Sequence, residues 1–164
     1  MKGPHVTDIA HHHRPKLYLD IDGVFLIPTA LDNYEYEWCL AEDADEFLDW
    51  ALVEFDCFWL TARDVRGERS EIERAFRVSL QSLSLPPFLI HALRHIEPTR
   101  WSGNKTTGID LDSDFYWIDD APSRTAVAEL SKRGLSDRLV TVEWGSPSSL
   151  QLTSARHRIV DKMA

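Results

Sequence analysis

The sequence has few of the features that mark membrane or secreted proteins. It holds only two cysteines, Cys39 and Cys57, so a disulfide framework is excluded and we expect a cytoplasmic location. It has no run of 18 or more apolar residues, which excludes a transmembrane helix. Residues 1–16, MKGPHVTDIAHHHRPK, contain no apolar stretch of the kind that a secretory signal needs, so we expect no such signal.

Positive charge is also scarce. The chain has 18 lysines and arginines against 27 aspartates and glutamates, and its formal net charge is −9. This balance opposes attraction to nucleic-acid phosphates or to an anionic membrane, because both need a basic surface. We therefore expect no membrane partner and no strong non-specific binding to nucleic acid. A bound divalent cation would neutralise part of the negative charge.

The length and composition are those of one soluble domain. The chain has 164 residues, of which 43% are hydrophobic and 27% charged. We expect an N-terminal tail over residues 1–15 and a single domain over residues 16–164. The histidines His11–His13 could bind a metal. Three adjacent imidazoles in a polar tail cannot all converge on one ion, however, so a disordered tail or a cloning remnant is favoured.

Apolar runs alternate with segments of helical spacing along the chain. We expect a loop or small flap at 25–42, helices at 43–55, 68–80 and 123–134, and strands at 16–20, 56–63, 88–93, 115–122 and 138–144. Alternation of this kind predicts an α/β fold with a central parallel sheet and helices on both faces, which is a three-layer sandwich.

Two of the apolar runs end in carboxylate pairs. KLYLDIDGVF, residues 16–25, leads into Asp20 and Asp22, and FYWIDDAP, residues 115–122, ends with Asp119 and Asp120. Ligands of parallel sheets bind beyond the carboxyl ends of the strands, so these side chains should meet at one edge, together with Thr61. Four bare carboxylates would repel each other strongly, and a hard cation such as Mg²⁺ would relieve that repulsion.

The spacing of these residues indicates separate roles. Beyond the strand end the backbone turns, so Asp20 can face the metal and the substrate, while Asp22 gives its carbonyl to the metal and its side chain to a leaving group. Gly23 permits the tight turn that this needs. Thr61 offers a hydroxyl and an N–H to an anionic oxygen, and Lys105 supplies positive charge for a phosphate and for the nucleophilic carboxylate.

With these residues in place, the chain resembles the haloacid dehalogenase-like (HAD) phosphohydrolases. Four motifs of that superfamily occur in order over roughly residues 16–145: DIDGV, FWLTAR, the lysine of GNKTTG, and YWIDD. Within the superfamily, the tryptophans and WIDD are most similar to the small HAD domains of Swiss-army-knife RNA repair proteins. The resemblance implies a Rossmann-like fold and a Mg²⁺-dependent hydrolase.

The resemblance also implies what each residue does. Asp20 would attack phosphorus and form an aspartyl-phosphate, and Asp22 would act as general acid and then as general base. Thr61 and Lys105 would stabilise charge on the phosphate oxygens. The metal ligands would be Asp20, Asp22, Asp119 and Asp120, with Asp119 binding directly and Asp120 either binding through water or orienting Lys105.

Two features bear on the substrate. Arg63, in the Thr-Ala-Arg that ends the second motif, could contact a substrate phosphate or pair with Asp64 or Glu68. The segments between motifs leave no room for a large cap domain, so the site should be open. Either a macromolecular end or a lid supplied by a partner could complete it, and an open site suits large substrates better than small ones. The expected partner is a phosphorylated substrate, which is a small molecule or a nucleic-acid end.

Other interpretations stay open. The chain could be a HAD-like binding or regulatory module without activity, or a phosphotransferase using the same residues. DLDSD, residues 110–114, lacks a preceding strand and is favoured as a solvated loop. His91 and His95 could be metal ligands if helical, yet no third ligand is near in sequence. Ser123 could touch substrate or cap a helix.

Overall fold

A five-stranded parallel sheet lies at the centre of the fold. The computed structural model describes residues 14–30, 36–143, 145 and 148–164. The sheet order is β5-β4-β1-β6-β7, and its strands are β1 (Lys16–Leu19), β4 (Asp56–Trp59), β5 (Glu97–Pro98), β6 (Phe115–Asp119) and β7 (Leu139–Thr141). Every neighbouring pair is parallel, so all the carboxyl ends lie along one edge of the sheet.

The order of the strands reverses at β1. The chain places β4 and β5 on one side of β1, and it places β6 and β7 on the other. In open α/β sheets a crevice forms beyond the carboxyl ends of the strands at such a reversal, because the connections leave in opposite directions. The segment after β1, which carries Asp20 and Asp22, therefore starts at the place where this topology builds ligand sites.

Alternate side chains of each strand enter two separate cores. Leu17 and Leu19 belong to the larger cluster of buried residues, whereas Tyr18 between them belongs to the smaller one. The same alternation separates Tyr116 from Trp117 in β6. A strand whose sheet is buried on both faces has apolar residues at nearly every position, which explains KLYL and FYWI in the sequence.

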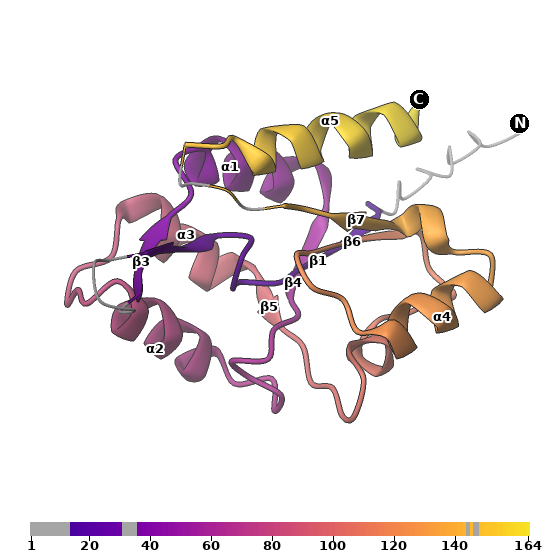
Figure 1. Cartoon of the computed structure of the whole chain (residues 1–164), viewed down its shortest axis with the longest axis horizontal. Helices are drawn as coiled ribbons and strands as arrows, with labels where there is room; N and C mark the ends of the chain where they lie inside the picture. Colours follow the sequence, from indigo (N-terminus) through magenta and orange to yellow (C-terminus); the bar gives the residue numbers. More distant parts are fainter. Residues whose placement is uncertain (1–13, 31–35, 144, 146–147) are drawn as a thin grey trace, which may run out of the picture.

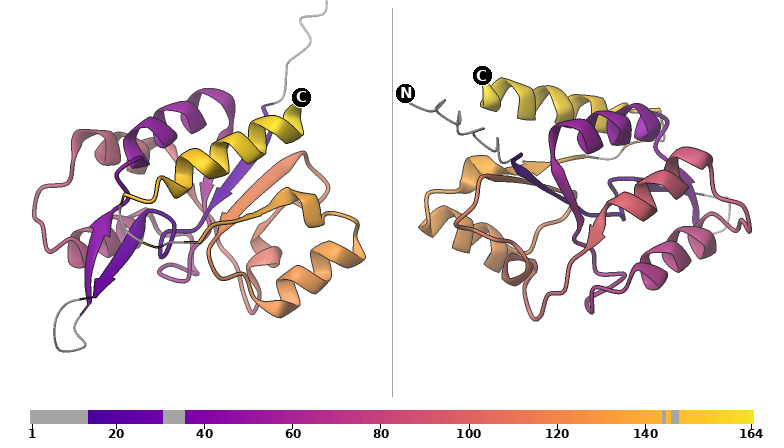
Figure 2. Two further views of the ribbon diagram at one scale, coloured as in Figure 1. Left: turned by 45° about the horizontal axis from the view of Figure 1, so that its top comes forward. Right: turned by 180° about the vertical axis from the view of Figure 1, so that it is seen from behind.

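Helices cover both faces and complete three layers (Figures 1 and 2). The larger cluster is filled from α1 (Ala44–Glu54), α2 (Arg69–Ser79), α3 (Pro87–His95) and α5 (Gln151–Met163), and the smaller one from α4 (Arg124–Lys132) and Ile109. In Figure 1, α1 and α5 lie on one side of the sheet and α4 on the other. The predicted Rossmann-like α/β sandwich without a large cap is confirmed.

A β-hairpin occupies the segment for which the sequence predicts a loop or small flap. Strand β2 (Leu26–Ala30) pairs antiparallel with β3 (Tyr36–Leu40), and Pro28 lies opposite Trp38. Residues 31–35 between them lie outside the described part of the chain, as does the histidine run His11–His13. The hairpin continues the chain beyond the carboxyl end of β1, after Asp20 and Asp22.

The strand predicted at residues 88–93 is wrong, because this segment is part of helix α3. Pro87 stands at the first helical turn, where its missing N–H costs nothing and its fixed φ favours the helix. Leu89, Ala92 and Leu93 are buried at helical spacing. The apolar pattern of so short a run fits a strand and a helix equally well, and Pro87 was the sequence signal that favoured the helix.

The C-terminal helix α5 was not among the expected elements. Its apolar stripe of Leu152, Ala155 and Ile159 is fully buried in the larger core. The Gln151 side-chain amide donates to the carbonyl oxygens of Gly23 at 3.2 Å and Val24 at 3.0 Å. Within the described ranges, none of the helices has the length and apolar composition needed to cross a bilayer.

Replacement of Leu89 tests the packing of α3. Leu89 is fully buried, so Leu89→Ala should lower the free energy of unfolding by about 2–5 kcal/mol, since it removes apolar contacts and leaves a cavity. Leu83→Ala is the matched control, because Leu83 is 96% exposed and should change stability by less than about 0.5 kcal/mol. Urea unfolding measures both, and equal losses would contradict the packing of α3.

Candidate active site

Two buried carboxylates stand side by side where β1 and β6 end. The register pairs Leu19 with Ile118, so Asp20 and Asp119 follow at the same level. The Asp20 N–H donates to the Ile118 carbonyl at 3.0 Å, which continues the ladder up to the carboxylate. Asp20 is 6% exposed and Asp119 only 1%. Burial of two acids this close requires a compensating positive charge.

Lys105 supplies that charge. Its Nζ lies 2.7 Å from Asp20 Oδ2 and 2.7 Å from Asp119 Oδ2, so one ammonium bridges both acids. Lys105 starts the 3-10 turn η1 (Lys105–Gly108), and only 15% of its side chain is exposed. The sequence prediction that Lys105 faces the nucleophilic carboxylate agrees with this geometry.

The protonation of the site depends on this arrangement. Burial raises the pKa of Asp20 to about 7, with the Lys105 charge opposing the rise and Asp119 adding to it. Burial pulls the pKa of Lys105 down, but the charges of Asp20 and Asp119 outweigh it, and the net direction is upward. Lys105 is therefore a cation at neutral pH, while Asp20 is close to its titration point.

A third carboxylate completes an acidic cluster. Among the described residues, one oxygen each from Asp20, Asp119 and Asp120 lies within 4.8 Å of the others. A Cβ placed on Gly23 would lie 2.0 Å from Asp120 Oδ2, and Gly23 has φ +69°, so a glycine here leaves the space that the Asp120 carboxylate fills. Oxygen-only ligands around a small gap fit Mg²⁺.

Thr61 lies at the end of β4, beside the segment that carries Asp20. It is 1% exposed. Its carbonyl accepts from Trp101 Nε1 at 3.0 Å, and its hydroxyl oxygen accepts from the Arg63 N–H at 3.2 Å. The hydroxyl proton is thus free to point toward an anionic oxygen, which is the role that the sequence predicts.

Asp22 has a different partner from the other acids. Its carboxylate accepts from Arg63 in three contacts: Nε to Oδ1 at 3.1 Å, Nε to Oδ2 at 2.8 Å, and Nη2 to Oδ1 at 2.7 Å. Its side chain is not in the cluster of three, so a contribution of Asp22 to metal binding depends on its backbone carbonyl. The sequence suggested Asp64 or Glu68 as partners for Arg63, but Arg63 pairs with Asp22.

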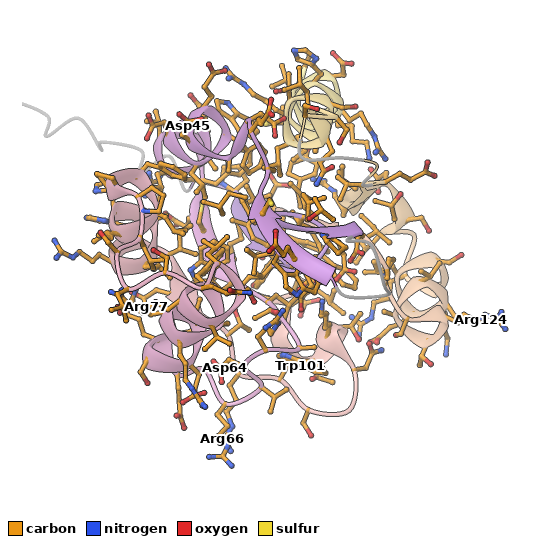
Figure 3. The ribbon with its side chains drawn as sticks, turned by 60° about the vertical axis from the view of Figure 1, so that its left-hand side comes forward. Asp45, Asp64, Arg66, Arg77, Trp101 and Arg124 are labelled. Carbon is orange, nitrogen blue, oxygen red and sulfur yellow. The ribbon has the colours of Figure 1, made fainter. Side chains whose placement is uncertain are left out.

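The two loops that carry Thr61 and Lys105 are joined to each other. Trp101 N–H donates to the Val65 carbonyl at 3.1 Å, and Arg66 and Arg100 form an antiparallel bridge. Figure 3 shows Trp101 near the loop with Asp64 and Arg66, and the Arg66 side chain points away from the molecule. From the sequence alone the tryptophans supported only the family resemblance, and Trp101, which precedes the GNK motif, was assigned no role in the site.

The remaining candidates lie elsewhere or have structural roles. Asp110 pairs with Lys16 and Asp114 with Arg138, so DLDSD contributes surface ion pairs. Ser123 caps α4, because its Oγ accepts from the Ala126 N–H at 3.1 Å. His91 and His95 lie on α3 and belong to no group of three metal-ligating side chains among the described residues. Gln151, which holds the Gly23 turn, carried no sequence signal.

Substitution of Gly23 tests the carboxylate cluster. Gly23→Ala adds a methyl group where Asp120 stands and strains a left-handed φ. It should displace the Asp120 carboxylate and weaken the Mg²⁺ binding that the sequence predicts by about tenfold or more in calorimetry. Gly134→Ala is the matched control, because Gly134 has φ +71° and nothing within 4 Å of a built Cβ. Both should lose about 1–2 kcal/mol of stability. Unchanged Mg²⁺ affinity in Gly23→Ala would contradict the cluster.

The raised pKa of Asp20 predicts a pH dependence of stability. Between its ordinary value near 3.8 and about 7, the folded protein holds a proton that the unfolded chain has released. The free energy of unfolding should therefore fall as pH rises through this window, by at most about 1.4 kcal/mol per pH unit for this group. Urea unfolding without Mg²⁺ should show this fall in wild type relative to Asp20→Asn. A constant difference between pH 4 and 8 would contradict it.

Comparisons of the sequence with known proteins assign no family. No protein-family model matches the chain, and no curated protein matches it. The resemblance to HAD phosphohydrolases therefore remains an expectation from the four motifs. The function must be argued from the geometry of Asp20, Lys105 and Asp119 at the edge of the sheet.

Proposed function

We propose that this protein is a Mg²⁺-dependent phosphomonoester hydrolase that works through an aspartyl-phosphate. One observation carries the proposal: the Lys105 ammonium lies 2.7 Å from both Asp20 and Asp119 at adjoining strand ends, with Asp120 completing a cluster within 4.8 Å. A buried acid held beside an ammonium at a sheet edge is the arrangement that nucleophilic catalysis by a carboxylate needs.

In the first step an Asp20 oxygen attacks phosphorus. The bond between phosphorus and the leaving oxygen breaks as the bond to Asp20 forms, which gives an aspartyl-phosphate and an alcohol. Asp22 gives the leaving oxygen its proton. Lys105 and Thr61 stabilise charge on the equatorial phosphate oxygens, so positioning and electrostatics carry most of this step.

In the second step a water molecule attacks the same phosphorus. Asp22, which is now ionised, takes a proton from this water. The bond between phosphorus and the Asp20 oxygen breaks, so inorganic phosphate leaves and the Asp20 carboxylate is restored. Each group has then returned to its starting state, and the net reaction is the hydrolysis of one phosphate ester.

The carboxylates of Asp20, Asp119 and Asp120 would hold the Mg²⁺, joined by the backbone carbonyl of Asp22. The ion, when bound, would lower the negative charge on the phosphate that Asp20 must approach. At rest, three carboxylates and the Lys105 ammonium leave two negative charges for the ion to offset, and the ionised Asp22 forms a neutral pair with Arg63. Asp22 takes up a proton from solvent before the first step, and in that form it acts as the general acid. Arg63 could also contact substrate if it leaves Asp22.

The substrate class is the least constrained part of the proposal. The motif resemblance favours a nucleotide or a nucleic-acid end phosphate, while the net charge of −9 opposes tight binding along a strand. A partner could supply a lid over the uncapped site. The substrate class can be tested by a screen of nucleotides, 3′- and 5′-phosphorylated oligonucleotides and sugar phosphates. A preference for a small sugar phosphate would count against a nucleic-acid end as the substrate.

The cellular location is a proposal as well. Cys39 and Cys57 are both free thiols, and burial raises the pKa of Cys57 to about 12, which keeps it unreactive. Free thiols are compatible with a reducing compartment, and we propose the cytoplasm.

A second candidate function is a HAD-like binding module without turnover. The observation that favours it is the full engagement of Asp22 by Arg63, which occupies the group needed for proton transfer. Inactivity across the screen together with no Mg²⁺ binding in calorimetry would support it. A phosphotransferase is distinguished by adding an alcohol acceptor such as glycerol, because it would form a new phosphate ester.

Loss of the nucleophile tests the mechanism. Asp20→Asn should lower Mg²⁺-dependent hydrolysis of p-nitrophenyl phosphate by at least about 100-fold, since the amide cannot form the aspartyl-phosphate. Asp112→Asn is the control, because the Asp112 side chain is 97% exposed and should leave the rate unchanged. Equal activity of Asp20→Asn and wild type would overturn the mechanism.

A further inference from the structure

The Asp22 carboxylate is the end of a chain of contacts that starts in the hairpin. Arg63 holds Asp22 in three contacts of 2.7–3.1 Å. The Arg63 guanidinium in turn lies over the ring of Trp38, with its central carbon 5.3 Å from the ring centroid. Trp38 belongs to β3, so three separate segments of the sequence meet in a row: the hairpin, the loop after β4, and the loop after β1.

Trp38 is held by the body of the protein. It is paired across the hairpin with Pro28, and its side chain is partly buried against the larger hydrophobic core. The Trp38 ring is therefore held in one position, with one of its faces toward the Arg63 guanidinium. A guanidinium over an aromatic face is attracted to the ring, and the attraction grows as the pair is removed from water.

Arg63 would have room to move without these two partners. It borders a hollow of about 180 Å³ against α2 and another of about 320 Å³ over the loop that follows it. Its backbone N–H is held by the bond to the Thr61 hydroxyl, while 27% of its side chain is exposed. Trp38 and Asp22 are therefore what hold the guanidinium.

We propose that Trp38 is a positioning residue for the general acid. The inference depends on the proposed function and deepens it: Trp38 fixes the plane of the Arg63 guanidinium, and Arg63 fixes the Asp22 carboxylate where it meets the leaving oxygen. A planar, bidentate donor sets the orientation of a carboxylate as well as its place. The hairpin thereby acts on proton transfer without touching the substrate.

This role makes a prediction that a purely structural role does not. The kcat/KM of the reaction reports the step in which the leaving oxygen departs. Ethyl phosphate releases an alkoxide that needs the proton from Asp22, whereas p-nitrophenyl phosphate releases a stable anion that needs none. Loss of Trp38 should therefore harm the first substrate far more than the second.

The experiment compares Trp38→Ala with wild type on both substrates in the presence of Mg²⁺. We expect kcat/KM to fall about tenfold for ethyl phosphate and less than about twofold for p-nitrophenyl phosphate, which is part of the factor that a positioned acid contributes. Trp38→Phe keeps an aromatic face and should restore most of the loss. A fall by the same factor on both substrates, or no fall, would overturn the inference.

Trp50 provides a matched control on the same molecule. It too lies beneath an arginine, with the central carbon of Arg156 5.2 Å from its ring, and it too packs partly against the larger core. Trp50→Ala removes a comparable tryptophan from α1 and should scale kcat/KM equally for both substrates. A leaving-group effect in Trp50→Ala equal to that of Trp38→Ala would also overturn the inference.

A second variant covers the case in which Trp38→Ala fails to fold. Arg63→Gln changes a side chain that is 27% exposed and should give the same selective loss on ethyl phosphate. Where Trp38→Ala folds, adding it to Arg63→Gln should cause no further selective loss, since Trp38 acts through Arg63. If wild type hydrolyses neither substrate, the result contradicts the proposed function itself. If wild type is active and Arg63→Gln lowers kcat/KM equally for both substrates, the result overturns only the inference about Trp38.

Discussion

The bridge from Lys105 to Asp20 and Asp119 is the interaction on which the candidate site depends. Two unit charges at about 4 Å interact with about 1 kcal/mol in water but about 4 kcal/mol at the effective dielectric near a protein surface. Repulsion between two nearly buried acids is of this order, and desolvation of each adds to it. One ammonium at 2.7 Å from both offsets these costs. Without the Lys105 ammonium, the carboxylates of Asp20 and Asp119 would repel each other with no compensating charge.

The position of this ammonium is set far from the acids in sequence. Lys105 follows β5, and the loop that carries it is tied by Trp101 to the carbonyl of Thr61 at the end of β4. The N–H of Trp101 donates to Val65 in the same loop. The cation and the hydroxyl thus belong to one joined unit, so a shift of either loop moves both groups relative to Asp20.

The central strands and the acidic residues at their ends could be predicted from the sequence. A strand buried on both faces must be apolar throughout, so KLYL and FYWI indicate central strands, and the carboxylates that end them must share an edge. Lys105 was identified as the lysine of the GNKTTG motif. The position of each carboxylate directly after its strand therefore predicts where it lies in the fold.

The sequence could not predict features that depend on contacts between distant segments, because such contacts leave no periodic pattern in the sequence. The sequence offered Asp64 and Glu68 as partners for Arg63, and only the folded chain shows that Arg63 pairs with Asp22 instead. Residues 88–93 have the composition of a strand, and Pro87 with the packing of Leu89 decides for a helix. Trp38 and Arg63 meet only because the hairpin folds back beside the loop after β4.

The bonds from Gln151 to the turn at Gly23 and Val24 tie the first acidic segment to a helix 128 and 127 residues further along the chain. During synthesis, Asp20 and Asp22 leave the ribosome early, but the turn that orients them lacks its amide clamp until α5 has emerged and docked. The turn that follows Asp20 and Asp22 is therefore complete only once α5 has docked.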